Sequence, residues 1–180
     1  MKLTRLNRTL FLIPITFFWG CGVLVGSVKP VTEPSSDFSI LDLHQLRPAW
    51  QNVDSPSKHP SNEPQVSYQL KAYGNLIALN STCRPRFASE TLSLNDALNS
   101  LLQGFGNVQA RTDQFIVIDQ RKALYSSGSL RIENRPMQYE AVMARDGDCL
   151  FDLMHLSSQK HFIHGTEDFS RFYKSMKFKK

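Results

Sequence analysis

The first 28 residues constrain this chain more than any later segment. Three basic residues (Lys2, Arg5 and Arg8) precede an uncharged run over residues 9–28 that is rich in leucine, isoleucine and phenylalanine. A basic start followed by about ten apolar residues is typical of a secretory signal peptide. We therefore expect the rest of the chain to fold outside the cytoplasm.

Cys21 indicates how this signal ends. It follows the apolar run and stands between Gly20 and Gly22, a setting in which a bacterial lipoprotein signal peptidase cuts and leaves a lipidated cysteine as the first residue. Phe18 and Trp19 precede Gly20, where lipoprotein signals usually carry Leu and a small residue. We expect cleavage before Cys21, with a palmitate-bearing anchor that holds the chain on a membrane.

Two alternatives to a lipid anchor remain open. The uncharged run is about 20 residues long, which just suffices to span a bilayer as an uncleaved anchor helix. A plain secretory signal could also be cut at another position. Under each of the three interpretations, the rest of the chain is exported from the cytoplasm. Because Gly22 rather than Asp follows Cys21, its resemblance to sorting signals indicates the outer membrane, with the domain facing the periplasm.

The net charge of +5 raises the question of nucleic-acid binding. Cleavage before Cys21 removes three of the 21 basic residues and none of the 16 acidic ones, which leaves a net charge of +2. This excess is too small for a surface that tracks phosphates. We expect no nucleic-acid partner.

Composition divides the chain into three parts. Residues 1–20 are the signal peptide, residues 21–64 a tether, and residues 65–180 a globular domain. The tether ends in a segment, residues 54–64, that contains three prolines and three serines, a composition typical of an extended linker. Before this linker lies an apolar patch, which we expect to cover an edge of the core, with docking on a partner as the alternative: Phe38, Ile40, Leu41, Leu43, Leu46 and Trp50.

The domain starts with strand patterns and then a helix. Alternating apolar residues predict strands over 66–70 and 76–79. Ser93 followed by Asp96 predicts a capping box at a helix start, and Gly104 predicts the helix end. The apolar stripe of this helix has a helical spacing: Leu94, Ala97, Leu98, Leu101 and Leu102.

The second half of the domain predicts an antiparallel sheet and a closing helix. Strand-like segments cover 108–112, 115–119, 123–132, 137–145 and 149–156, with turn signals at 112–113, 126–128, 133–136 and 146–148. Such short connections produce antiparallel neighbours. Thr166 predicts the N-cap of a last helix whose buried stripe is Phe169, Phe172, Tyr173 and Met176. The fold class is therefore α+β, an antiparallel sheet flanked by helices in an α/β/α sandwich.

If Cys21 carries a lipid, Cys83 and Cys149 are the two cysteines left with a free thiol. Both belong to the exported domain, where disulfides form and persist. Cys83 ends the first strand region and Cys149 opens the last strand, positions that can be neighbours in one sheet. We expect a disulfide between them. It would stabilise the fold by up to about 4 kcal/mol, because it closes a loop of about 67 residues.

No group of residues in the sequence predicts catalysis or a cofactor. His161 and His164 could share a metal with Glu167 or Asp168, but no cysteine or third strong ligand lies at the spacing of a structural site. Asp152 and His155 lie three apart on one strand, so they point to opposite faces and cannot form an acid/base pair. We expect no metal, no cofactor and no enzymatic activity.

At scattered positions the chain resembles uncharacterised Gram-negative envelope lipoproteins that have a Mog1/PsbP-like (DcrB-like) domain. The matching positions are Gly20-Cys21-Gly22, Leu24-Val25-Gly26, Val28-Lys29-Pro30, Asn80-Ser81-Thr82-Cys83-Arg84, the 94–104 helix, Asp148-Cys149-Leu150-Phe151-Asp152-Leu153, Asp168-Phe169, Phe172, Ser175 and Phe178. The resemblance implies an α/β/α sandwich that serves in binding or assembly more often than in catalysis.

This resemblance and the anchor together predict a non-enzymatic envelope lipoprotein. Its periplasmic domain is expected to bind a protein partner or a lipid. Alternatives are an auxiliary lipoprotein of a lipid-transport or secretion complex, a single-pass signal-anchored protein and, with the weakest support, an envelope hydrolase.

Overall fold

The computed structural model describes residues 38–53, 66–83 and 93–178, all within one compact unit. The signal peptide, Cys21 and the 54–64 linker lie outside the described residues. The elements in chain order are β1 (Phe38–Ser39), α1 (Leu43–Leu46), β2 (Trp50–Asn52), β3 (Val66–Leu70), β4 (Asn75–Cys83), α2 (Leu94–Phe105), β5 (Asn107–Ile118), β6 (Arg121–Ile132), β7 (Arg135–Asp146), β8 (Cys149–Ser158), α3 (Ile163–Lys174) and β9 (Lys177–Phe178).

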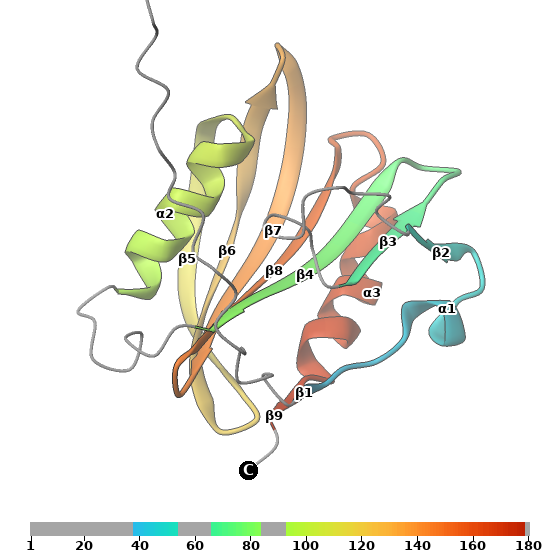
Figure 1. Ribbon diagram of the computed structural model, residues 1–180. Helices are drawn as coiled ribbons and strands as arrows, with labels where there is room; N and C mark the ends of the chain where they lie inside the picture. The colour runs from blue at the N-terminus through green and yellow to red at the C-terminus, as the bar shows by residue number, and fades with distance from the viewer. Residues whose placement is uncertain (1–37, 54–65, 84–92, 179–180) are drawn as a thin grey trace, which may run out of the picture. The chain divides into compact units, whose positions relative to one another are not determined.

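Within the described residues, seven strands form one antiparallel sheet in the order β2-β3-β4-β8-β7-β6-β5. The four longest neighbours, β5 to β8, follow one another along the chain as a meander (Figure 1). Strand β4 joins this meander from a distant part of the sequence and pairs with β8 from Leu76 to Cys83. The predicted α+β class with an antiparallel sheet is confirmed.

Two of the predicted turns are confirmed. Glu133 and Asn134 have φ angles of 47° and 67°, and Gly147 has a φ of 54°. These left-handed conformations reverse the chain between β6 and β7 and between β7 and β8. A turn that the sequence did not indicate lies between β5 and β6, where Asp119 and Gln120 have φ angles of 42° and 67°.

The turns predicted at 112–113 and 126–128 are wrong. Strands β5 and β6 continue through both segments, with Thr112 opposite Ser127 and Arg111 opposite Gly128. A Cβ atom at Gly128 would collide with the backbone oxygen of Ala110. The glycine therefore serves the close approach of two strands next to a β-bulge, and it does not mark a chain reversal.

Helix α2 starts as the sequence predicts. The Ser93 side chain accepts from the backbone N–H of Asp96, and the Asp96 carboxylate accepts from the N–H of Ser93 in return, a complete capping box. The helix ends later than predicted, because Gly104 lies inside it and Gly106 is the C-cap. Its buried residues are Ala97, Leu98 and Leu102.

Helix α3 starts three residues before the predicted N-cap. Thr166 lies inside it, and its Oγ1 donates to the carbonyl of Phe162, one turn earlier. The expected buried stripe is present, with Phe169 and Phe172 both fully buried. Helix α3 packs on β4 and β8, while α2 packs on β5, β6 and β7.

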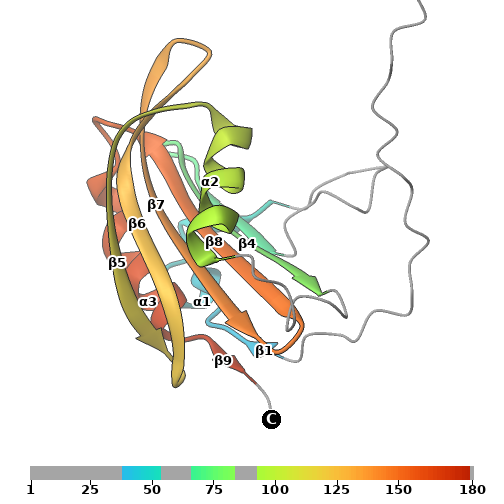
Figure 2. The ribbon, with the colours of Figure 1, turned by 90° about the vertical axis from the view of Figure 1, so that its left-hand side faces the viewer.

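The two helices cover opposite faces of the sheet, so the domain is an α/β/α sandwich. Figure 1 shows the sheet between α2 and α3, and Figure 2 shows α2 in front of the sheet and α3 behind it. Each face has its own cluster of buried side chains. Among the helices of the described segments, none has the length and apolar character to cross a membrane.

The domain begins earlier than residue 65, which corrects the predicted boundary. Strand β2 extends the sheet by pairing with β3, and β1 pairs with β9 near the C-terminus. Leu43 and Trp50 are fully buried in the α3-side core. The apolar patch assigned to the tether therefore belongs to the domain and closes one edge of its core.

Candidate functional site

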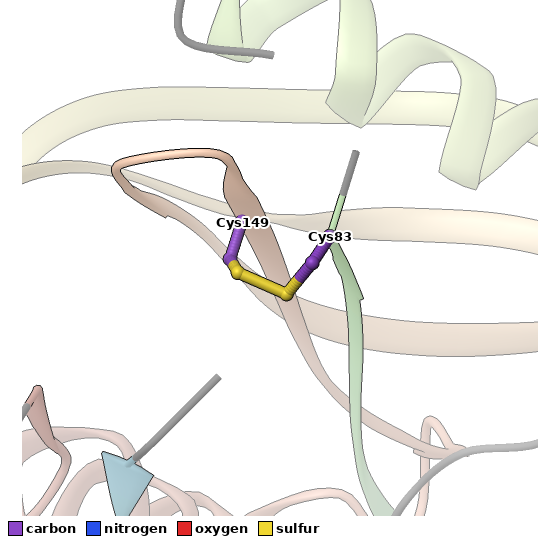
Figure 3. The surroundings of a disulfide bond; sticks show 2 residues. All are labelled: Cys83 and Cys149. Atoms are coloured by element: carbon purple, nitrogen blue, oxygen red, sulfur yellow. A yellow bond between two sulfur atoms is a disulfide. The ribbon is translucent and has the colours of Figure 1, made fainter. Parts of the chain in front are cut away.

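The disulfide lies at one end of the sheet (Figure 3). Cys83 is the last residue of β4 and Cys149 the first of β8, and the two are direct partners in the antiparallel register. Their Sγ atoms are 2.05 Å apart and their Cα atoms 4.0 Å apart. The pairing agrees with the expectation from the sequence.

Aromatic side chains continue from the disulfide to the point where the chain enters the domain. Phe151 lies two residues after Cys149 on the same face of β8, and its ring is 5.5 Å from that of Phe38 and 5.1 Å from that of Phe178. Phe38 and Phe178 are partners in the β1–β9 pair. The disulfide, the start of the domain and its C-terminal strand therefore meet at one end of the α3-side core.

Asp168 of α3 holds the N-terminal segment of the domain in place. Its Oδ2 accepts from the indole N–H of Trp50 at 2.8 Å and from the guanidinium of Arg47 at 3.3 Å. The carboxylate side chain is only 13% exposed, so these charge-assisted bonds are partly shielded from solvent. The contact fixes β2 to the helix that covers its sheet.

Asp42 and Tyr68 form a second link to this segment. The Tyr68 hydroxyl donates to Asp42 Oδ1 at 3.0 Å. Burial raises the pKa of Tyr68 to about 12, and the hydrogen bond and negative charge of Asp42 add to the rise. Tyr68 therefore stays protonated and keeps donating over the whole physiological pH range.

A buried polar network lies under α3, around His155. The imidazole Nδ1 is 3.0 Å from Glu140 Oε2, and Nε2 is 2.8 Å from Asn75 Oδ1. Glu140 Oε1 accepts from the Tyr125 hydroxyl at 2.6 Å. His155 and Asn75 have no exposed surface, and Glu140 has 6%. The network joins strands β4, β8, β7 and β6.

The hydrogen-bond directions place a proton on Nε2 of His155. Asn75 uses its Nδ2 to donate to the carbonyl of His161, so the Oδ1 that faces His155 accepts. Burial raises the pKa of Tyr125, and its bond to Glu140 raises it further. Both ring nitrogens of His155 and both oxygens of Glu140 are engaged within the protein. The network therefore stabilises the core and offers no atom to a substrate.

Asp152 and His155 lie on opposite faces of β8, as the sequence predicts. His155 lies under α3, whereas Asp152 is on the α2 side, where the Asn80 amide donates to its Oδ2 at 3.2 Å. Burial raises the pKa of Asp152 to about 6, and the bond from Asn80 opposes the rise only in part. Among the described carboxylates, Asp152 is therefore the one whose ionised form most clearly destabilises the folded state.

His161 and His164 lie near each other around the start of α3. Their ring centroids are 6.1 Å apart, and Tyr73 stacks on His164 at 3.9 Å. Asp168, a possible further ligand, is engaged by Trp50 and Arg47. In the part of the chain that the structure describes, no group of three His, Cys, Asp or Glu side chains could hold a metal ion.

The His155–Glu140 pair was not predicted from the sequence. Each is a single ionisable residue in an apolar run, Glu140 in Tyr-Glu-Ala-Val-Met and His155 in Leu-Met-His-Leu. The two become direct partners only through the register of β7 on β8. Polar residues at core positions on neighbouring strands are the signal that could have indicated the network.

Comparison with known proteins supports the fold alone. No family of known proteins and no curated protein matches the sequence. Among solved structures, LpqN of Mycobacterium tuberculosis, described as involved in cell envelope biogenesis, is similar over 80% of this chain and 83% of its own, with a TM-score of 0.54 and 9% identity. The cyanobacterial PsbP protein CyanoP of Synechocystis is similar over 86% of this chain and 99% of its own, with a TM-score of 0.52 and 10% identity.

A third solved structure, from Bacteroides thetaiotaomicron, has a TM-score of 0.50 and 9% identity over 79% of this chain. This chain spans only 45% of that protein's length. The sheet order, the helices and these similarities together define the domain as a PsbP-like α+β fold. A protein involved in cell envelope biogenesis and a cyanobacterial PsbP protein are thus both among the structures that share it.

Proposed function

We propose that this chain is a lipoprotein of the bacterial cell envelope whose domain binds a protein partner in the periplasm. The observation that supports export is the disulfide between Cys83 and Cys149, in a chain whose first 28 residues have the pattern of a signal sequence. Disulfides persist in oxidising compartments such as the periplasm and are rare in the cytosol. The lipid on Cys21 keeps the exported domain at a membrane.

The packing of the sandwich favours a protein partner over a lipid ligand. Phe169 and Phe172 of α3 fill the space against one sheet face, and Leu98 and Leu102 of α2 fill the space against the other. Each of these side chains is at most 1% exposed. An acyl chain that entered either interface would have to displace them. Recognition is therefore assigned to the surface of the domain.

The state of the buried histidine argues for a non-enzymatic role. A general base needs an accessible nitrogen within hydrogen-bond reach of its substrate. His155 is fully buried, and Glu140 and Asn75 engage both of its nitrogens. LpqN, which shares the fold, is described as involved in cell envelope biogenesis, and a supporting role in the envelope suits this chain by analogy.

Cell fractionation of wild type and Cys21→Ala tests the proposal. Wild-type protein should stay with membranes through salt and alkaline washes and should sediment with the outer membrane. Cys21→Ala, which keeps its uncut apolar run, should leave the outer-membrane fraction and have a larger mass than the cleaved wild type, whereas Cys83→Ala, which removes a different cysteine, should behave as wild type. Wild type and Cys21→Ala with the same uncleaved mass in the same membrane fraction would overturn the lipid anchor and favour a signal-anchor helix.

A further inference from the structure

Strand β5 leaves one long edge of the sheet open. In the described part of the chain it pairs with β6 on one side and has no neighbour on the other. The strand has 12 residues, and its only irregularity is a register shift between Val108 and Ala110. From Ala110 to Ile118 it is a regular strand, and one row of its backbone groups has no partner strand among the described residues.

The turn after β5 shows which backbone groups face this edge. Asp119 and Gln120 both have positive φ, the signature of a two-residue type I′ turn, in which the flanking pair is hydrogen-bonded. Ile118 and Arg121 are that pair. Because hydrogen-bonded and non-hydrogen-bonded pairs alternate, the residues that direct N–H and C=O groups to the open edge are Arg111, Asp113, Phe115 and Val117.

The side chains of these four residues favour association. Phe115 is 57% exposed and Val117 is 74% exposed. Arg111 and Asp113 form an ion pair with each other, so the edge carries no net charge. Natural edge strands are usually protected by charged side chains, above all lysine, by proline, by bulges or by short length. Between residues 110 and 118 this strand has no lysine, proline or bulge, and its two charged side chains, Arg111 and Asp113, pair with each other.

We propose that β5 pairs antiparallel with β5 of a second copy of this chain, about a two-fold axis at Gln114. The four edge-facing residues are centred on position 114, so self-pairing about this position places each opposite another edge-facing residue. Arg111 then lies opposite Val117 of the second copy, and Asp113 opposite Phe115 of the second copy. All edge-facing groups from 111 to 117 are satisfied, and the two sheets become one.

Side-chain chemistry agrees with this register. The two Phe115 rings become diagonal neighbours, a separation that aromatic side chains can bridge. Val117 packs on the aliphatic stem of Arg111 of the second copy. The neutral Arg111–Asp113 pairs avoid repulsion between copies. The inference goes beyond the proposed function and holds whether or not Cys21 carries a lipid.

One test compares Val117→Lys with Ile163→Lys in the full chain, purified in mild detergent. The two positions are matched, with exposed fractions of 74% and 73%. Wild type and Ile163→Lys should sediment with twice the protein mass of one chain, and Val117→Lys should sediment as a single chain with its melting curve preserved. A single-chain mass for wild type at all protein concentrations, or an unchanged dimer in Val117→Lys, would overturn the proposal.

Cysteine cross-linking tests the register. Gln114→Cys places two thiols at the two-fold axis, in a non-hydrogen-bonded pair close enough to bridge. Thr112→Cys lies on the same face of the same strand, but its two copies are offset by four residues, about 13 Å. Mild oxidation should link Gln114→Cys into covalent dimers and leave Thr112→Cys and the parent protein unlinked. Cross-linking of Thr112→Cys in place of Gln114→Cys would contradict the proposed axis.

Discussion

Gly165 of α3 lies directly against the imidazole of His155 on β8. A Cβ atom at this glycine would be 2.5 Å from His155 Nε2 and 2.7 Å from Asn75 Oδ1. The helix can therefore reach the sheet at this point only because residue 165 has no side chain. The close approach seals the buried network, with the ring of Phe162 stacked on His155 at 4.5 Å.

Gly165→Ala should destabilise the fold, because the added methyl group must push α3 away or displace His155. We expect a loss of about 1–3 kcal/mol in the free energy of unfolding, measured by chemical denaturation. Gly104→Ala is the matched control. Gly104 also lies in a helix, but nothing is within 4 Å of its Cβ position, so a gain of about 0.5–1 kcal/mol is expected. Equal effects of both substitutions would contradict the account of the Gly165 contact.

Asp168→Ala should weaken the attachment of the N-terminal segment. The substitution leaves the buried Trp50 indole N–H without its acceptor, a loss of about 1–3 kcal/mol. Glu167→Ala, one residue earlier, removes only an exposed pair with Arg171 and should cost at most about 0.5 kcal/mol. Trp50 is the single tryptophan of a chain that starts at Cys21, so its fluorescence should change in Asp168→Ala alone. A spectrum that is unchanged in this variant would argue against the contact.

Asp152→Asn should stabilise the protein at neutral pH and not in acid. The folded-state pKa of about 6 lies above the usual value of 3.8, so the folded state binds a proton more tightly than the unfolded chain. The free energy of unfolding therefore falls as pH rises from 3.8 to about 6, and it stays reduced at higher pH. An amide avoids the charge and can still accept from Asn80. We expect a gain of roughly 1–3 kcal/mol at pH about 7.5 and none at pH about 3.5, where a gain of equal size would point to another cause.

Reduction of the disulfide should lower the stability of the domain. Cys83 and Cys149 are separated by 66 positions, and a cross-link over such a loop stabilises by up to about 4 kcal/mol. Purified protein should show no free thiol before reduction and should melt at a lower temperature afterwards. Two reactive thiols in the unreduced protein would rule out the bridge.

Local patterns in the sequence were sufficient for most of the fold. The Ser93–Asp96 capping box, the Phe169–Phe172 stripe and the hairpin at Glu133–Asn134 each depend on residues close together in the chain. For this reason the helices, the antiparallel sheet and the sandwich could be predicted. The strand ends at Cys83 and Cys149 also allowed their pairing to be proposed.

The sequence misled where the meaning of a residue depends on distant partners. Gly128 resembles a turn residue, but its role comes from the backbone of Ala110. Trp50 lies in an apolar patch that the sequence assigned to the tether, and it is the Asp168 acceptor and the pairing of β2 with β3 that place it in the core. The His155–Glu140 pair needs the register of two strands, which spacing along one strand cannot supply.

Metabolic labelling with palmitate tests the central claim, the lipid on Cys21, most directly. Cells that express the full chain are grown with labelled palmitate, and the protein is isolated and compared with Cys21→Ala and Cys83→Ala. The account predicts label on the wild type and on Cys83→Ala, and none on Cys21→Ala. A wild-type protein without label, and with the mass of the uncleaved chain, would contradict it.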